Sequence, residues 1–134
     1  MVWRAAAWPG CLLHATERGI AFVDVSHAVS VENAADLDDW LSAHADTERE
    51  VVIAIYKQAS GKQRVTLDAL QEVALCHGWV DTQTQRIDEE RYAIRFVPRR
   101  PGSHWSITNR QVARRLLDEG RMRARGLATL PDDL

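Results

Sequence analysis

The spacing of apolar residues predicts a first amphipathic helix that begins near residue 33. Its buried face is formed by positions three or four residues apart: Leu37, Trp40, Leu41 and His44. The acids between them fall on the opposite face, toward water. Either Ser30 or Asn33 caps the N-terminus, because a side-chain oxygen there accepts a hydrogen bond from a backbone N–H that the helix leaves unpaired.

A second helix is predicted over residues 66–78, with Thr66 as the N-cap and Gly78 in the left-handed position that closes many helices. Its polar residues before Cys76 are Asp68, Gln71 and Glu72, so apolar residues cover most of its circumference. A helix of this kind is central and is covered on several sides by other elements.

A third helix is expected to begin after Ser106 and to end at Gly120. Four residues form its predicted buried face: Val112, Ala113, Leu116 and Leu117. The tail from Arg121 is expected to add a short helical turn around Leu127 and Leu130.

Runs typical of β-strands lie between these helices. Residues 51–56 are β-branched and aromatic and predict a strand buried on both faces, and residues 22–25 form a shorter run. Residues 79–87 and 91–97 predict a hairpin, since apolar and polar residues alternate along the second run. The expected fold is α+β: a small, mainly antiparallel sheet including a β-hairpin, packed with three to four helices.

The length of 134 residues fits one domain, expected over residues 21–134, with residues 1–20 as an irregular N-terminal leader. No run approaches the roughly 18 apolar residues that span a bilayer, and the start lacks an unbroken secretory core. The two cysteines and five histidines show no metal-site or redox spacing. We therefore expect a cytoplasmic protein without metal or cofactor.

Charge is distributed unevenly along the chain. Eight acids lie between residues 24 and 50 against the single base Arg49, whereas nine arginines lie between residues 95 and 125 against only Asp118 and Glu119. This asymmetry, hidden by a net charge of -2, indicates an anionic partner for the C-terminal third.

Residues with catalytic potential are present, but their spacing does not favour catalysis. Cys76 and His77 are adjacent on a helix and point about 100° apart, so they cannot form a nucleophile–base pair, and Cys76 is expected to be buried. Asp81 and Asp88 lie near several arginines, which favours ion pairing over acid–base work. We assign no catalytic residue.

The segment of residues 98–106, which leads into the third helix, is the richest candidate site. Arg99 and Arg100 at a helix N-terminus can complete a site for phosphate or carboxylate, with Trp105 as a stacking wall. Alternatively, both arginines pair with Asp88, Glu89 and Glu90 of the hairpin, and Trp105 lies in the core. The candidate ligand-binding residues are Trp79, Asp81, Arg86, Arg99, Arg100, Ser103, Trp105, Ser106 and Asn109.

A series of motifs in order resembles the YdeI/OmpD-associated bacteriocin-protection family. They are residues 56–62 (YKQASGK), 74–81 (ALCHGWVD), 86–88 (RID) and 98–103 (PRRPGS), followed by Trp105, Ser106 and Asn109. The resemblance covers about residues 35–130 and departs from the family pattern at His77 and Thr82. It implies a bacterial role in tolerance of antimicrobial peptides or envelope stress, with no established catalytic residue or cofactor.

The leading hypothesis is therefore a non-enzymatic binding protein that accepts an anionic group or a protein partner at residues 99–105. Its groove is expected to be formed by the hairpin, this loop and the N-terminus of the third helix. A second hypothesis is nucleic-acid binding by the basic C-terminal third. A third is an enzyme of unrecognised type that uses Cys76, Asp81 or Tyr56. The oligomeric state is left open.

Overall fold

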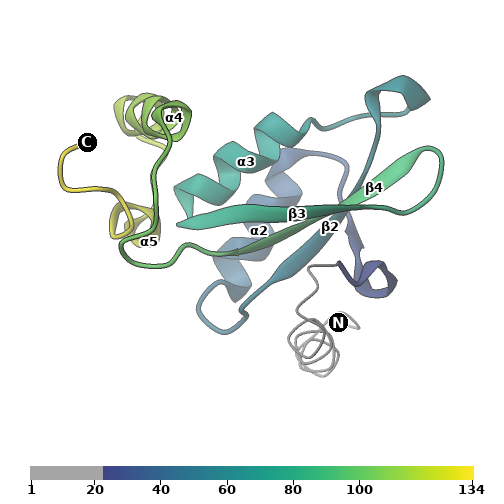
Figure 1. The fold of residues 1–134 in the computed structure, drawn as a ribbon, viewed down its shortest axis with the longest axis horizontal. Coiled ribbons are helices and arrows are strands. Elements are labelled where there is room, and N and C mark those ends of the chain that lie inside the picture. Colours follow the sequence, from purple (N-terminus) through teal and green to yellow (C-terminus); the bar gives the residue numbers. More distant parts are fainter. Residues whose placement is uncertain (1–22) are drawn as a thin grey trace.

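The structure is a computed structural model, and it describes residues 23–134. Ten elements follow one another: η1 (Val25–His27), β1 (Val29–Ser30), α2 (Ala34–His44), β2 (Val51–Tyr56), η2 (Gln58–Ser60), α3 (Leu67–Cys76), β3 (Trp79–Arg86), β4 (Arg91–Pro98), α4 (Ile107–Asp118) and α5 (Ala124–Leu127). The four strands form one sheet in the order β1-β2-β4-β3, in which only β1 and β2 are parallel. This confirms the α+β class with a mainly antiparallel sheet and a β3–β4 hairpin (Figure 1).

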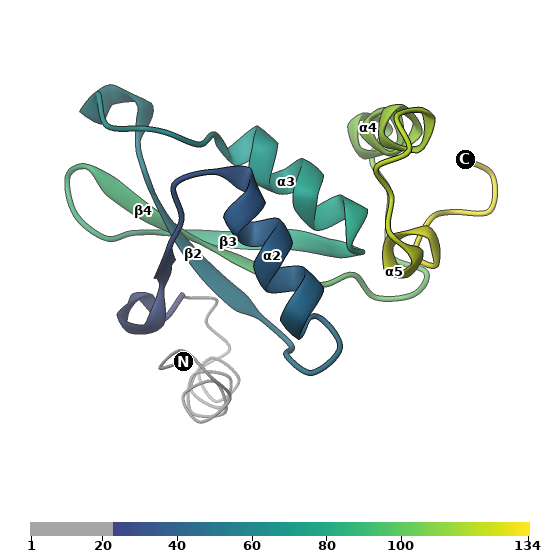
Figure 2. The ribbon, with the colours of Figure 1, turned by 180° about the vertical axis from the view of Figure 1, so that it is seen from behind.

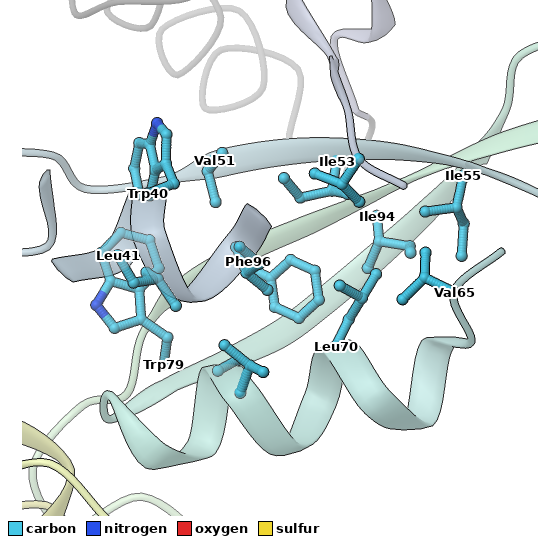
Figure 3. Close-up of a cluster of buried hydrophobic side chains, with 14 of the residues drawn as sticks. Trp40, Leu41, Val51, Ile53, Ile55, Val65, Leu70, Trp79, Ile94 and Phe96 are labelled. Carbon is cyan, nitrogen blue, oxygen red and sulfur yellow. The ribbon is translucent and has the colours of Figure 1, made fainter. Parts of the chain in front are cut away.

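The main core lies between one face of the sheet and the helices α2 and α3. Alternate strand residues such as Ile53, Ile94 and Phe96 meet Leu41 of α2 and Leu70 of α3, as Figure 3 shows. Because alternate residues of a strand point to opposite faces, the register of β4 sends Phe96 into this core and its neighbours Arg95 and Val97 to the other face. That second face becomes important for the site.

Part of the second face is covered by the segment that precedes the sheet. Val23 packs there against Val52 of β2 and Ala93 of β4. All five residues of β2 from Val51 to Ile55 are buried, which confirms a strand covered on both sides.

The helix α3 is central, as its apolar circumference predicts. It packs against α2 and β3 and also against α4 and α5, which lie at the end of the sheet opposite the β3–β4 turn (Figures 1 and 2). The approach of α5 requires Gly126, because a Cβ atom there would lie 2.1 Å from the carbonyl oxygen of Cys76. No helix in residues 23–134 has the length and apolar character needed to cross a membrane.

The predicted caps form as hydrogen bonds. The side chains of Asn33, Thr66 and Ser106 accept from backbone N–H groups three residues later at 3.0, 3.1 and 3.0 Å. Asn33, rather than Ser30, therefore caps α2. Gly78 and Gly120 follow their helices with φ of 78° and 69°, as expected of residues that end helices in the left-handed region.

Two details of the expected fold are wrong. Residues 22–25 were predicted as a strand, but within the described chain Asp24 accepts a hydrogen bond from Ser26 N–H at 3.0 Å and starts the 3-10 turn η1, so the strand forms later, as β1. Leu117 remains 38% exposed, because α4 packs through Val112, Ala113 and Leu116. The expected leader, residues 1–20, lies outside the described residues.

Candidate functional site

The acidic and basic parts of the sequence pair with each other inside one chain. Arg123 binds Asp38 of α2 at 3.0 Å, and Arg125 binds Asp46 at 2.5 Å. The other pairs of the C-terminal third are Arg95 with Glu50, Arg110 with Asp133, and Arg115 and Arg121 each with Glu72 and Glu119. Six of its nine arginines are therefore partly neutralised, which weakens the prediction of a broad basic face.

Five arginines have no carboxylate partner among residues 23–134. They are Arg49, Arg86, Arg99, Arg100 and Arg114. Three of these five, Arg49, Arg99 and Arg100, gather around one depression on the face of the sheet away from α2 and α3. Its volume is about 520 Å³.

We call this depression the basic hollow. Its lining residues are Arg49, Val80, Thr82, Arg95, Val97, Pro98, Arg99, Arg100 and Ser103. Four of the nine are arginines, and no acid is among them. Strand alternation explains the set, because Arg95 and Val97 of β4 and Val80 of β3 point away from the core.

Arg99 occupies the junction between β4 and the loop to α4. Its backbone N–H donates to Gly78 O at 2.8 Å, and its guanidinium lies over the ring of Trp105, 4.0 Å from the centroid. Its Nη1 also donates over longer distances to Ser103 Oγ at 3.4 Å and His104 O at 3.3 Å. Burial lowers the pKa of Arg99, and the negative charge of Asp81 opposes that shift. A desolvated guanidinium without a bonded carboxylate favours an anion beside it.

A tight turn brings the loop back beneath Arg99. Ser103 N–H donates to Arg100 O at 3.1 Å, with Pro101 and Gly102 between them and φ of 73° at Gly102. Proline followed by a left-handed glycine is the sequence of a type II turn. The turn leaves Arg100 exposed at the rim of the basic hollow.

A second depression lies on the helix side of the sheet, and we call it the α3–α4 hollow. It is lined by Asp68, Gln71, Glu72, Leu75, Trp79, Val80, Asp81, Arg99, Thr108, Asn109 and Val112, and its volume is about 240 Å³. This is the groove that was expected between the hairpin, the loop and the third helix. Three acids line it against one arginine, so it does not favour a simple anion.

The structure distributes the candidate residues over these two hollows. Trp79, Asp81, Arg99 and Asn109 line the α3–α4 hollow, and Arg99, Arg100 and Ser103 line the basic hollow. Trp105 is only 8% exposed and packs with Leu116, so it serves as the floor beneath Arg99. Ser106 is occupied as the cap of α4.

Arg86 is separated from the other candidates. It lies at the far end of β3 and pairs in register with Tyr92, seven residues from Trp79 along an extended strand, roughly 23 Å away.

The hairpin turn is equally distant from Arg99. Asp88 binds Arg91 there at 3.2 Å and Glu90 binds Lys62 at 2.9 Å. The alternative that Arg99 and Arg100 pair with this turn is therefore wrong, although its placement of Trp105 in the core is confirmed.

Sequence reasoning missed three polar residues of the basic hollow: Arg49, Thr82 and Arg95. The available signal was the alternation of β4, where Phe96 is apolar and Arg95 must face the other way. Arg49 was noted only as the one base of an acidic segment. Its position beside β4 depends on the pairing of β2 with β4.

Cys76 and His77 point to different surroundings, as predicted. Cys76 is buried beside Leu75 and Trp105, and burial raises the pKa of its thiol. His77 Nε2 lies 2.7 Å from Asp38 Oδ1 instead. Among the described residues, no group of three or more His, Cys, Asp or Glu side chains has an arrangement suited to a metal ion.

The residues of the enzyme hypothesis lie apart. Cys76 borders a separate depression with Asp38, Arg121 and Arg123, whereas Asp81 lines the α3–α4 hollow. Tyr56 ends β2 opposite Arg91, near the hairpin turn. A shared active site of these three residues has no support from their positions.

The structure shows a small α+β protein with two depressions, the basic hollow and the α3–α4 hollow, on its surface. Comparison with known families places it more closely: the model of a domain of unknown function, DUF8412, matches residues 29–129, and the chain belongs to this family. No curated protein and no solved structure matches the chain significantly.

Proposed function

We propose that this protein is a non-enzymatic binding protein that holds an anionic group in the basic hollow. The observation that carries the proposal is the gathering of Arg49, Arg99 and Arg100 there, while most other arginines of the C-terminal third are paired internally. Their charges are not compensated by any bonded acid in residues 23–134, so an anion entering the hollow experiences their combined field.

The chemistry of the lining favours phosphate or carboxylate. Guanidinium groups donate two parallel hydrogen bonds to either group, and Thr82 and Ser103 add hydroxyl donors. The fourth arginine, Arg95, is bound to the buried Glu50, which holds it in place and reduces its contribution to the field. Val80, Val97 and Pro98 provide apolar surface beside the charged groups, which suits an anionic group carried on a larger molecule.

The cellular role rests on resemblance alone. The motifs of residues 35–130 that resemble the YdeI/OmpD-associated family support a proposed role in tolerance of antimicrobial peptides or envelope stress. Within that proposal the protein acts in the cytoplasm, where a phosphate- or carboxylate-bearing molecule or protein segment is its partner.

The experiment is a thermal-shift and tryptophan-fluorescence titration with inorganic phosphate, inositol hexakisphosphate and vesicles of anionic phospholipid. We expect at least one probe to raise the melting temperature by several degrees, because binding to the folded state alone adds stability. The double variant Arg99→Ala with Arg100→Ala is expected to lose that shift.

The matched control is Arg86→Ala with Arg114→Ala, which removes the same charge from arginines outside the hollow. If both double variants lost the thermal shift equally, the shift would depend on net charge and not on the basic hollow, and this would contradict the proposal. The same holds if none of the probes produces a shift in the wild type.

A further inference from the structure

The strand β3 leaves one edge of the sheet open. It is the last strand in the order β1-β2-β4-β3, and among the described residues β4 alone pairs with it. The opposite edge is blunted because β1 has only two residues, whereas β3 has eight, with the sequence WVDTQTQR. Natural proteins often protect a long edge with lysine or proline, and β3 contains neither. Its free backbone groups can therefore pair with a further strand.

The hydrogen bonds at the two ends of the hairpin show which backbone groups face this open edge. Ile87 N–H donates to Arg91 O at 3.1 Å, and Arg99 N–H donates to Gly78 O at 2.8 Å. Hydrogen-bonded and non-hydrogen-bonded pairs alternate along an antiparallel ladder. Counting from both ends, through the register shift in β3, gives the residues between 80 and 87 whose backbone N–H and C=O groups both point away from β4: Asp81, Thr84 and Arg86.

The register shift also places the side chains of these three residues on one face of the sheet. Asp81, Thr84 and Arg86 lie opposite alternate residues of β4, from Phe96 to Tyr92, which point to the face covered by α2 and α3. In a strand without the shift, Asp81 and Arg86 would point to opposite faces. Because of the shift, the three steps from Asp81 to Thr84 match two steps of β4, the same length that separates Thr84 from Arg86.

Asp81 and Arg86 carry opposite charges that no ion pair within residues 23–134 neutralises. Gln71 of α3 donates to Asp81 Oδ2 at 3.2 Å, which leaves Oδ1 for another donor, and Arg86 is exposed at the end of β3. Opposite charges directly across two neighbouring strands attract each other, and like charges there repel. The open edge thus carries one acid and one base about equally far from Thr84.

We propose that β3 pairs antiparallel with β3 of a second copy of this chain, around a two-fold axis at Thr84. Thr84 then lies opposite Thr84 of the second copy, and the equal spacing brings Asp81 opposite Arg86 on both sides of the axis. All three residues direct backbone groups to the other strand, so the ladder continues and an ion pair forms at each end. The same surface serves both copies, as a two-fold axis requires.

The register shift is essential to this match. A bulge in an edge strand usually works against pairing with another chain. Here, a strand without the shift would bring Thr82 opposite Arg86 of the second copy and leave both charges unpaired. The axis is perpendicular to the sheet, so the helices of both copies cover the same face of one continuous sheet. This inference does not rest on the proposed anion function of the basic hollow.

Sedimentation equilibrium of the full chain over a range of concentrations tests the pairing. We expect the mass to rise from that of one chain, 15.1 kDa, toward twice that value as the concentration increases. A mass that stays at one chain leaves the edge to a strand of another protein and overturns the proposal. A mass that passes two chains also overturns it, because a two-fold pair is closed.

Charge reversal tests whether β3 is the contact. Arg86→Asp places an acid opposite Asp81, and Asp81→Arg places a base opposite Arg86. Each single variant is expected to raise the dissociation constant about tenfold, because one substitution turns two attractions into repulsions. The double variant Asp81→Arg with Arg86→Asp restores opposite charges and should recover the wild-type constant.

The matched control is Arg114→Asp, which makes the same charge change as Arg86→Asp at an exposed position of α4. It should leave the dissociation constant unchanged. Three results overturn the proposal: an unchanged constant in either single variant, no recovery in the double variant, or an equal loss in the control.

Thr84→Pro tests the backbone pairing independently of charge. Thr84 N–H faces the open edge, so proline removes no hydrogen bond from the sheet of one chain, and edge strands accept proline at such positions. The variant is expected to show cooperative thermal unfolding like that of the wild type and to keep the mass of one chain. Dimers of Thr84→Pro with the wild-type dissociation constant overturn the proposal.

Discussion

Asp38 joins the central helix to the C-terminal turn: its Oδ1 lies 2.7 Å from Nε2 of the buried His77, and its Oδ2 accepts from Arg123 Nη2 at 3.0 Å. One carboxylate of α2 therefore contacts the end of α3 and the start of α5. His77 is 2% exposed, so loss of its partner leaves a buried polar group unsatisfied.

The variant Asp38→Asn is expected to lower the free energy of unfolding by about 1–3 kcal/mol at pH 7, because the neutral amide lacks the negative charge that strengthens the contacts with His77 and Arg123. Urea denaturation followed by tryptophan fluorescence measures it. Asp39→Asn is the matched control, because Asp39 is an exposed neighbour that makes no hydrogen bond or ion pair to the described residues. Equal destabilisation by both substitutions would contradict the assigned role of Asp38.

The same pair predicts a pH dependence. The hydrogen bond from His77, followed by the charge of Arg123, holds the pKa of Asp38 below its ordinary value of 3.8. A lowered folded-state pKa gives stability that is fully present above the unfolded-state pKa, about 3.9, and that disappears as the pH falls through the folded-state value. The stability difference between wild type and Asp38→Asn should therefore be constant from pH 7 to 5 and shrink below about pH 4. A difference that grows on acidification would contradict this.

The close approach of α5 to α3 depends on the absence of a side chain at Gly126. A methyl group at this position would lie 2.1 Å from the Cys76 carbonyl oxygen, which is backbone and cannot move aside. Gly126→Ala is expected to destabilise the protein by about 3 kcal/mol, at the upper end of the cost of overpacking. Thermal unfolding measures the loss.

Gly120→Ala is the control for this prediction. Gly120 has a φ of 69° but no atom within 4 Å of its would-be Cβ, so only backbone strain of about 1–2 kcal/mol is expected. If both alanine variants lost the same stability, steric contact with Cys76 would not be the reason for Gly126.

These features show what the sequence predicts and what it does not. Local signals identified the caps at Thr66 and Ser106, the hairpin, and the central position of α3, because each depends on residues only a few positions apart. The partner of Asp38 could not be predicted, since Arg123 lies 85 residues further along the chain. The basic hollow was only partly predicted, because Arg49 and Arg95 reach it through the pairing of β2 with β4.

The ion pairs that the arginines of the C-terminal third form within the chain also predict weak nucleic-acid binding. Each phosphate contact contributes about −0.9 to the slope of log affinity against log salt concentration for duplex DNA. With only Arg99, Arg100 and Arg114 unpaired among the nine arginines of the C-terminal third, the slope should be no steeper than about −3. Fluorescence anisotropy with a duplex oligonucleotide at several salt concentrations measures it. A slope near −6 or steeper would support the nucleic-acid hypothesis.

The central claim is that the basic hollow holds an anionic group, and ¹⁵N-resolved NMR during titration with inorganic phosphate tests it most directly. The account predicts saturable shifts of the amide signals of Arg49, Thr82, Arg99 and Ser103, with little change in α2 or along the outer face of α4. Shifts spread over α4, or none that saturate, would contradict it.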